Sequence, residues 1–281
     1  MTLSEEEHQR KQKRSQRGKA SNPKEAMKGS PYQISGIDPK LQQHYQGRLD
    51  NLTKPVASLG RLEELACRYA AIRHPDLSGL DSKYLFTFAA DHGVAQAGVS
   101  LYPREVTAQM VQNFLSGGAA INVLCKKYGI ENVIVDVGVD HDFDSIEGLV
   151  QKKVRAGTRN FIQHEAMTAE ESEQCVEVGF QLAGQYAERG AGLVGAVEMG
   201  IGNTTSASAI FSAATQWEPQ RLTGRGTGVD QAGIKRKIRV ISEALKLHQP
   251  DSRDPWDILK KVGGYEIGAV MGMVLGCAAR L

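Results

Sequence analysis

Short apolar runs alternate along the chain with longer segments whose apolar residues recur at helical spacing. Three runs, within residues 83–93, 132–140 and 191–200, have the length and composition of buried strands. The segments of helical spacing are residues 38–55, 58–74, 107–129, 168–190, 205–215, 233–248 and 254–281. The pattern therefore predicts strands alternating with helices from about residue 83 onward.

Local signals place some of the helix ends. Gly117-Gly118 divides residues 107–129 into one or two helices, and a second Gly-Gly pair interrupts residues 254–281. Thr168, followed three residues later by Glu171, predicts a capping box at the start of a long helix. The apolar face predicted for the helix at 58–74 consists of Leu59, Leu62, Leu65 and Ala66.

Alternating strands and helices are typical of an α/β fold: a doubly wound, mostly parallel sheet with helices on both faces. In such folds ligands bind beside the carboxyl ends of the strands. The three predicted strands end in Asp91-His92-Gly93, Asp136-Val137-Gly138 and Glu198-Met199-Gly200. We therefore predict a candidate site at that edge of the sheet.

Size and composition limit the classes of partner. A chain of 281 residues that is 41% hydrophobic is long enough for a substantial core, and its net charge of +2 gives no reason to expect nucleic acid or membrane as a partner. No window approaches the roughly 18 apolar residues of a membrane span. The four cysteines are far apart and form no CxxC pair, which favours a reducing, cytoplasmic environment over disulfides or structural zinc.

The beginning of the chain has a different composition. Residues 8–19 are rich in Arg, Lys and Gln and lack the apolar residues needed to fold alone. We predict that residues 1–30 form a disordered basic tail. A nucleic-acid-binding arm or a targeting segment is the alternative interpretation.

Two glycine-rich loops carry the strongest signals for a ligand. Residues 200–208, GIGNTTSAS, join a strand to a helix, so backbone N–H groups and the helix N-terminus can bind an anion, with Thr204 and Thr205 as further donors. The sequence is neither a P-loop nor a dinucleotide fingerprint. A tight turn without a ligand is the alternative.

The second loop, residues 223–237, is followed by a basic helix. Lys237 or Lys235 can give a positive charge to a phosphate, although several basic residues of this helix are expected to be solvated. Glu198 would repel a phosphate, so we expect it to face a ribose hydroxyl or a cationic part of the ligand. The residues alone thus predict a phosphorylated, ribose-like ligand with a cationic or aromatic base.

The remaining polar residues at the strand ends have two interpretations each. His92 is either an acid–base group or a histidine held in a turn by Asp91. Asp91 and Asp136 either bind a ligand or accept hydrogen bonds from loop amides. No ligand spacing calls for zinc, calcium or magnesium, so we predict no metal.

Six blocks of sequence, in order, carry a family resemblance. They are residues 54–66, 88–124, 135–140, 198–210, 224–237 and 254–272. Together they resemble the nicotinate-nucleotide:dimethylbenzimidazole phosphoribosyltransferase family, from about Pro39 to the last residue. The resemblance implies transfer of phosphoribose from nicotinate mononucleotide to 5,6-dimethylbenzimidazole, which yields α-ribazole 5′-phosphate and nicotinate in the synthesis of the cobalamin lower ligand. It implies no cofactor.

The resemblance also implies an assembly and a set of site residues. It predicts a homodimer, with a small helical subdomain built from the chain ends (here residues 31–83) and an α/β nucleotide-binding domain (residues 84–281). Glu198 would stabilise positive charge on the ribose. The other predicted substrate-binding residues are Gly200, Gly202, Asn203, Thr204, Thr205 and Lys237 for ribose and phosphate; Gly224, Arg225 and Gly226 for the nicotinate end; Tyr102 and Gln109 for the base; and Asp91 and His92 at the same edge.

Three departures from the family pattern leave an alternative open. The family continues to an RLGEG-type motif whose glutamate is the expected general base, whereas this sequence ends at Leu281. Val197 and Glu165 occupy positions where glycine and proline are usual. The alternative is therefore a non-catalytic homologue that binds nucleotide or benzimidazole, or an inactive fragment that lacks the general-base glutamate.

Overall fold

The computed structural model describes residues 32 and 34–280 of the chain. The predicted basic tail, residues 1–30, lies outside the described residues. The helices and strands belong to one compact unit, Gly36–Leu281. None of the described helices combines the length and the apolar character needed to cross a membrane.

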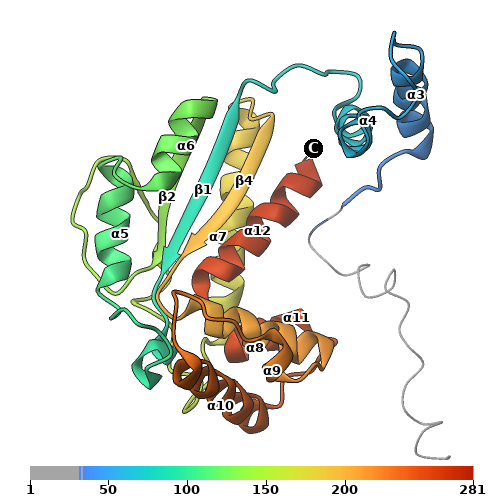
Figure 1. Cartoon of the computed structure of the whole chain (residues 1–281). Coiled ribbons are helices and arrows are strands. Elements are labelled where there is room, and N and C mark those ends of the chain that lie inside the picture. Colours follow the sequence, from blue (N-terminus) through green and yellow to red (C-terminus); the bar gives the residue numbers. More distant parts are fainter. Residues whose placement is uncertain (1–31, 33, 281) are drawn as a thin grey trace, which may run out of the picture. The chain divides into compact units, whose positions relative to one another are not determined.

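A four-stranded parallel sheet lies at the centre of this unit (Figure 1). Its strands are β1 (Lys83–Ala90), β2 (Ile130–Gly138), β3 (Leu149–Gln151) and β4 (Leu193–Met199), in the order β3-β2-β1-β4. All three pairings are parallel, which confirms the predicted α/β class. The sequence did not predict β3, because three residues are too few to show a period.

Helices cover both faces of the sheet (Figure 1). On one face α5 (Val106–Leu115) contacts β1 and β2, and α6 (Ala120–Tyr128) contacts β2. On the other face α12 (Tyr265–Arg280) contacts β1, β2 and β4, and it packs along α7 (Ala169–Glu188). The predicted break at Gly117-Gly118 is confirmed, because it separates α5 from α6.

Small residues allow α7 and α12 to pack closely. A Cβ on Gly272 would lie 1.8 Å from the carbonyl oxygen of Val176, and one on Gly179 would lie 1.9 Å from that of Ala269. Glycine is therefore required where the two backbones meet. The predicted capping box begins α7: the Thr168 hydroxyl accepts from Glu171 N–H, and the Glu171 carboxylate accepts from Thr168 N–H.

Four helices lie between β4 and α12 in the described chain, near the carboxyl ends of the strands (Figure 1). They are α8 (Asn203–Thr215), α9 (Pro219–Leu222), α10 (Gln231–His248) and α11 (Pro255–Val262). The Asp230 carboxylate caps α10 by accepting from Gly233 N–H, and the Asp254 carboxylate caps α11. The predicted Gly-Gly break between α11 and α12 is confirmed at residues 263–264.

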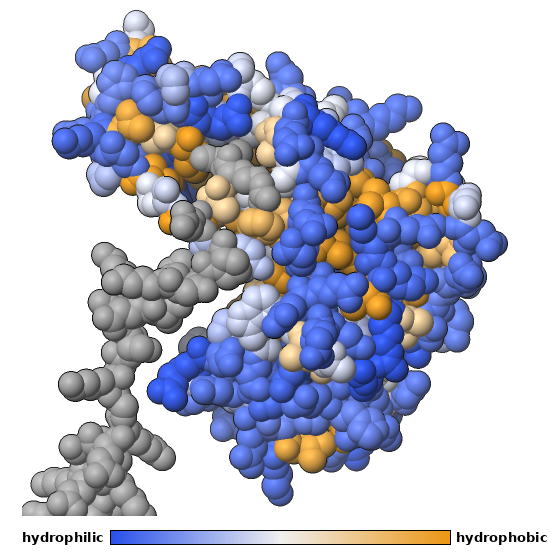
Figure 2. Space-filling model, turned by 180° about the vertical axis from the view of Figure 1, so that it is seen from behind, coloured by the Kyte–Doolittle hydropathy of each residue, from blue (hydrophilic) through white to orange (hydrophobic). Residues whose placement is uncertain are grey.

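The first two described helices, α3 (Pro39–Asp50) and α4 (Arg61–Arg73), pack on each other around Tyr45, Cys67 and Ala71. The apolar face predicted for α4 does not form this contact: Leu62 and Leu65 are 65% and 50% exposed. Glu63 is buried instead, because the Lys54 ammonium neutralises it at 2.8 Å. Figure 2 shows apolar atoms at the surface of this helix pair. The division at residues 83 and 84 stays a prediction.

Candidate functional site

The polar residues at the carboxyl edge of the sheet separate onto its two faces. In β1, Ala89 packs with Val111 and Phe114 of α5, whereas Phe86 packs against Tyr186 of α7. Ala89 is paired with Asp136 of β2, and Phe88 is paired with Glu198 of β4. Because side chains alternate along a strand, Asp136 lies toward α5 and Glu198 toward α7 and α12.

The Asp136 carboxylate is occupied by the protein itself. Its Oδ1 accepts from the N–H groups of Gly138 and Val139, and its Oδ2 lies 3.3 Å from Lys153 Nζ. Burial is the largest influence on the pKa of Asp136 and raises it, although these contacts oppose the shift. Asp136 therefore accepts hydrogen bonds from loop amides, as the second of its two interpretations predicted, and fixes the end of β2.

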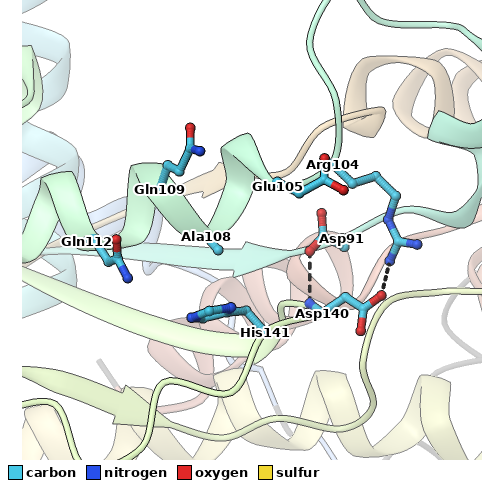
Figure 3. Close-up of a pocket in the computed structure, with 8 residues that line it drawn as sticks. All are labelled: Asp91, Arg104, Glu105, Ala108, Gln109, Gln112, Asp140 and His141. Carbon is cyan, nitrogen blue, oxygen red and sulfur yellow. Dashed lines mark hydrogen bonds and ion pairs between the residues drawn. The ribbon is translucent and has the colours of Figure 1, made fainter.

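Asp91 lines a cavity of about 340 Å³ beside α5 (Figure 3). Its Oδ2 accepts from Asp140 N–H at 2.8 Å, and Arg104 binds Asp140 across the opening at 2.9 Å. Burial raises the pKa of Asp91, while hydrogen bonds from Asp140 and Thr107 lower it. The other lining residues are Glu105, Ala108, Gln109, Gln112 and His141.

The two residues predicted for the base pocket lie in different settings. Gln109 lines the cavity beside Asp91. Tyr102 is 52% exposed and does not line that cavity; its N–H donates to the Ser100 hydroxyl. The structure therefore places Gln109, but not Tyr102, with Asp91.

His92 is fully buried, and its partner is not Asp91. Its Nε2 lies 2.5 Å from Oε1 of Glu266, a residue in the first turn of α12 whose side chain is also fully buried. Burial is the largest influence on the pKa of His92 and lowers it, but Glu266, Glu198 and Asp91 together outweigh burial and raise it. The sequence did not predict a role for Glu266. A lone acid after a Gly-Gly break, at the start of a very apolar helix, was the available signal.

Glu198 is exposed on β4, the strand at the edge of the sheet. Asn203 Nδ2 donates to Glu198 Oε2, which joins the carboxylate to the first residue of α8. The protein packed around the carboxylate raises the pKa of Glu198, and the charge of Glu266 adds to this shift. Glu198 is thus held in place and open to a ligand.

The glycines after the strands serve mainly to bring protein segments together. A Cβ on Gly93 would lie 2.4 Å from Asn160 N, and one on Gly200 would lie 2.2 Å from Ala90 O. Gly138 is likewise packed against the Tyr265 ring. Gly202 begins α8 with a φ of 99°, a conformation that suits glycine.

Lys237 is a buried cation beside the start of α8. Its side chain is 1% exposed, and Nζ donates to Thr204 Oγ1 at 2.8 Å and to Gly224 O at 3.4 Å. Among the described residues no carboxylate pairs with it, and burial lowers the pKa of its ammonium group. Lys235, the alternative in the sequence, is exposed. The hydroxyl of Thr205 is buried and has no hydrogen-bond partner among the described residues.

The second glycine-rich loop lies against this lysine. A Cβ on Gly226, which has a φ of 54°, would lie 2.8 Å from Thr204 Oγ1 and 3.1 Å from Lys237 Nζ. Residues 224–226 and the start of α8 therefore enclose the ammonium group. A buried positive charge, hydroxyl donors and a helix N-terminus form an arrangement suited to a phosphate.

The structure thus groups several of the predicted residues, together with Glu266, into three clusters. The first is the anion cluster of Lys237, Thr204, Thr205 and Gly226. The second is the acidic cluster of Glu198, Asn203, His92 and Glu266, and the third is the cavity with Asp91 and Gln109. The described residues contain no group of three or more His, Cys, Asp or Glu side chains able to hold a metal ion.

Known proteins of one family are similar to this chain. A family model described as a phosphoribosyltransferase matches residues 34–281. A nicotinate-nucleotide–dimethylbenzimidazole phosphoribosyltransferase of Geobacter sulfurreducens is 51% identical over 246 residues, which are 88% of this chain and 70% of that protein. A protein of the same name from Chloroflexus aggregans is 48% identical, again over 88% of this chain and 70% of its own length.

Solved structures show the same similarity. The crystal structure of CobT from Thermus thermophilus superimposes with a TM-score of 0.79 and 41% sequence identity. The alignment covers 85% of this chain and 71% of that one. Sequence and fold therefore agree on the family.

Proposed function

This chain belongs to the nicotinate-nucleotide–dimethylbenzimidazole phosphoribosyltransferase family, and on that premise we propose how its residues perform the family's reaction. The chain transfers phosphoribose from nicotinate mononucleotide to 5,6-dimethylbenzimidazole, in the synthesis of the cobalamin lower ligand. The products are α-ribazole 5′-phosphate, nicotinate and a proton.

The observation that carries the residue assignment is the buried ammonium group of Lys237. A charge at 1% exposure that pairs with no carboxylate among the described residues is costly to bury, unless an anion completes the site. The phosphate of nicotinate mononucleotide has the required charge, and its oxygens can accept from Lys237, Thr204 and Thr205. The N-terminus of α8 adds a favourable dipole.

In this proposal Glu198 lies beside the ribose, because Asn203 joins its carboxylate to the start of α8, where the phosphate binds. The bond between C1′ of the ribose and the pyridinium nitrogen breaks with its electron pair going to nicotinate, so positive charge develops on the ribose. An ionised carboxylate beside that charge stabilises the transition state more than the ground state. The benzimidazole nitrogen attacks C1′ from the opposite face, which inverts the β linkage to α.

A direct assay tests the proposal. The purified chain is incubated with nicotinate mononucleotide and 5,6-dimethylbenzimidazole, and α-ribazole 5′-phosphate and nicotinate are measured by chromatography. We expect both products in equal amounts, and we expect Glu198→Gln to lower kcat roughly 100-fold by removing the electrostatic stabilisation. Glu131→Gln, an exposed acid at the start of β2, is the matched control and should turn over like the parent.

Two other outcomes would change the proposal. Saturable binding of nicotinate mononucleotide without product would make the chain a non-catalytic binder, which was the alternative left by the sequence. Product from E198Q at the parent rate would remove Glu198 from the catalytic role while leaving the reaction in place.

The assembly and location of the protein are further parts of the proposal. We propose a homodimer in the cytoplasm, with residues 31–83 forming part of a small helical domain. The exposed apolar residues Leu62 and Leu65 of α4 support a contact beyond the described helix pair. Light scattering coupled to size-exclusion chromatography distinguishes one copy from two.

A further inference from the structure

His92 and Glu266 bring together segments that are far apart in the sequence. His92 follows β1, and Glu266 lies in the first turn of α12. The ring nitrogen Nε2 and the carboxylate oxygen Oε1 are 2.5 Å apart, and both side chains have zero exposure. A buried charge without a compensating partner is strongly destabilising, so we expect the charges of these two groups to compensate each other.

Three glycines fit closely around this pair. A Cβ on Gly264 would lie 2.4 Å from His92 Cε1 and 2.6 Å from Glu266 Oε2. Cβ atoms on Gly200 and Gly202 would lie 3.3 and 3.2 Å from His92 atoms. The loop that joins Glu198 to α8 therefore packs against His92.

His92 lies among acids and can offset the charge of one of them when it is protonated. The charge of Glu266 raises the pKa of Glu198, whereas the charge of His92 lowers it. Asp91 is the other acid that acts on His92. Cys175 of α7 lies near Glu266, but burial raises the pKa of its thiol to about 12, so it adds no charge. A neutral His92 would leave Glu198 facing an uncompensated Glu266.

We propose that His92 and Glu266 are a positioning pair: the protonated imidazole neutralises Glu266, which keeps Glu198 ionised, and His92 supports the loop that joins Glu198 to α8. This inference rests on the proposed function, because it assigns the pair to the residue that stabilises the developing ribose cation. The pair acts through Glu198 and touches no substrate itself. The charges of the pair determine the direction of its effect on Glu198. Loss of the positive charge of His92 hinders ionisation of Glu198, and loss of both His92 and Glu266 restores it.

Three variants separate the charge from the shape of the pair. His92→Gln keeps a donor toward Glu266 but removes the positive charge. Glu266→Gln removes the negative charge, and the double variant removes both. The pKa of Glu198 is measured in each by carboxyl ¹³C NMR, with the signal assigned by its loss in E198Q, and the acid limb of kcat is measured in parallel.

We expect H92Q to raise the pKa of Glu198, and with it the acid limb of kcat, by about one pH unit. We expect E266Q to leave the pKa of Glu198 unchanged or to lower it, and the double variant to return it to within about 0.3 units of the parent. A purely structural role would instead make the double variant at least as impaired as H92Q, with no movement of the acid limb.

Several results would overturn the inference. One is a Glu198 pKa that is equal in H92Q and the parent, and another is a shifted pKa with an unshifted acid limb. If H92Q does not fold, a rise of the Glu198 pKa in E266Q overturns it. If the parent forms no product, the proposed function fails on its own. The NMR titration and the pH dependence of the affinity for nicotinate mononucleotide then test the pair. Both must shift by about one pH unit in H92Q.

Discussion

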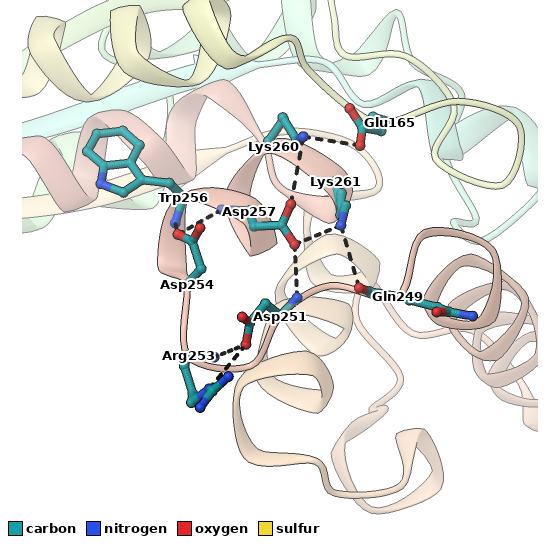
Figure 4. Close-up of polar contacts among 9 residues, drawn as sticks. All are labelled: Glu165, Gln249, Asp251, Arg253, Asp254, Trp256, Asp257, Lys260 and Lys261. Atoms are coloured by element: carbon teal, nitrogen blue, oxygen red, sulfur yellow. Dashed lines mark hydrogen bonds and ion pairs between the residues drawn. The ribbon is translucent and has the colours of Figure 1, made fainter. Parts of the chain in front are cut away.

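Buried or half-buried lysines lie on both α10 and α11, but their charges have different partners. Lys260 and Lys261 of α11 are 26% and 16% exposed, and both pair with Asp257, at 3.7 and 2.7 Å (Figure 4). Glu165 adds a further partner to Lys260. Lys237 of α10 is more deeply buried, yet it has only a hydroxyl and a carbonyl as partners.

The difference distinguishes a structural contact from the phosphate site that we propose. Asp257 also accepts from Asp251 N–H, so the α11 network ties the loop before the helix to the helix itself. Its charges are compensated within the chain. The charge of Lys237 is not compensated by any described carboxylate, so a ligand that brings negative charge gains from it. The following predictions, in order of decreasing effect, test this contrast.

The largest effect is expected from removing the unpaired charge. Lys237→Met should weaken the binding of nicotinate mononucleotide roughly 30- to 100-fold, because a charge-assisted hydrogen bond to phosphate contributes about 2–3 kcal/mol. Isothermal titration calorimetry measures the change. Lys235→Met, on the exposed face of the same helix, should leave the affinity within about twofold. Equal losses in both variants would contradict a specific phosphate site.

A smaller effect is expected from crowding the same ammonium group. Gly226→Ala places a methyl 3.1 Å from Lys237 Nζ and 2.8 Å from Thr204 Oγ1, at a backbone φ of 54°. We expect about tenfold weaker binding of nicotinate mononucleotide, since the strained loop costs roughly 1 kcal/mol or more. Gly47→Ala, where nothing lies within 4 Å of the new methyl, is the control. Unchanged affinity in G226A would place the ligand away from this loop.

The paired lysines should respond in stability rather than in binding. Asp257→Asn removes the shared partner of Lys260 and Lys261, and we expect it to lower the free energy of unfolding by about 1 kcal/mol. Affinity for nicotinate mononucleotide should not change. Urea unfolding followed by circular dichroism, with calorimetry on the folded variant, measures both. A loss of affinity in D257N would mean that the two lysine groups are coupled.

The smallest expected effect concerns how the stability of the chain depends on pH. Burial lowers the pKa of Lys237 from its ordinary 10.5, so between the lowered value and 10.5 the unfolded chain binds more protons than the folded one. The contribution of Lys237 to the stability of the parent therefore rises with pH in that window. Below it, K237M should be more stable than the parent by about 1 kcal/mol, because no charge is buried. The difference in the free energy of unfolding between K237M and the parent should be smaller at pH 10 than at pH 7. An equal difference at both pH values would contradict a buried charge at Lys237.

The sequence predicted much of the fold. The three longer strands, the break between α5 and α6, the capping box of α7 and the Gly-Gly break before α12 are confirmed, because each depends on residues that are neighbours in sequence. The three residues of β3 gave no pattern. The burial of Glu63 in place of Leu62 and Leu65 was also missed, since it depends on Lys54 and on the position of α3.

The candidate site was predicted in part. Lys237, Thr204 and Glu198 were named from glycine-rich loops and strand ends, and the structure places Lys237 beside Thr204 and Asn203 beside Glu198. Glu266 was missed because its partner, His92, is 174 residues away along the chain. A pattern of neighbouring residues cannot indicate a contact between residues so far apart in the sequence.

The sequence by itself determined the alternation of strands and helices, the family and the residue types at each strand end. These follow from periodicity and from blocks of adjacent residues. Only the tertiary structure decided which face of the sheet each acid occupies, which lysine is buried without a carboxylate, and that His92 pairs with Glu266. The physical reason is that burial and charge compensation depend on atoms brought together by packing, and the free energy of a charged group is set by those neighbours.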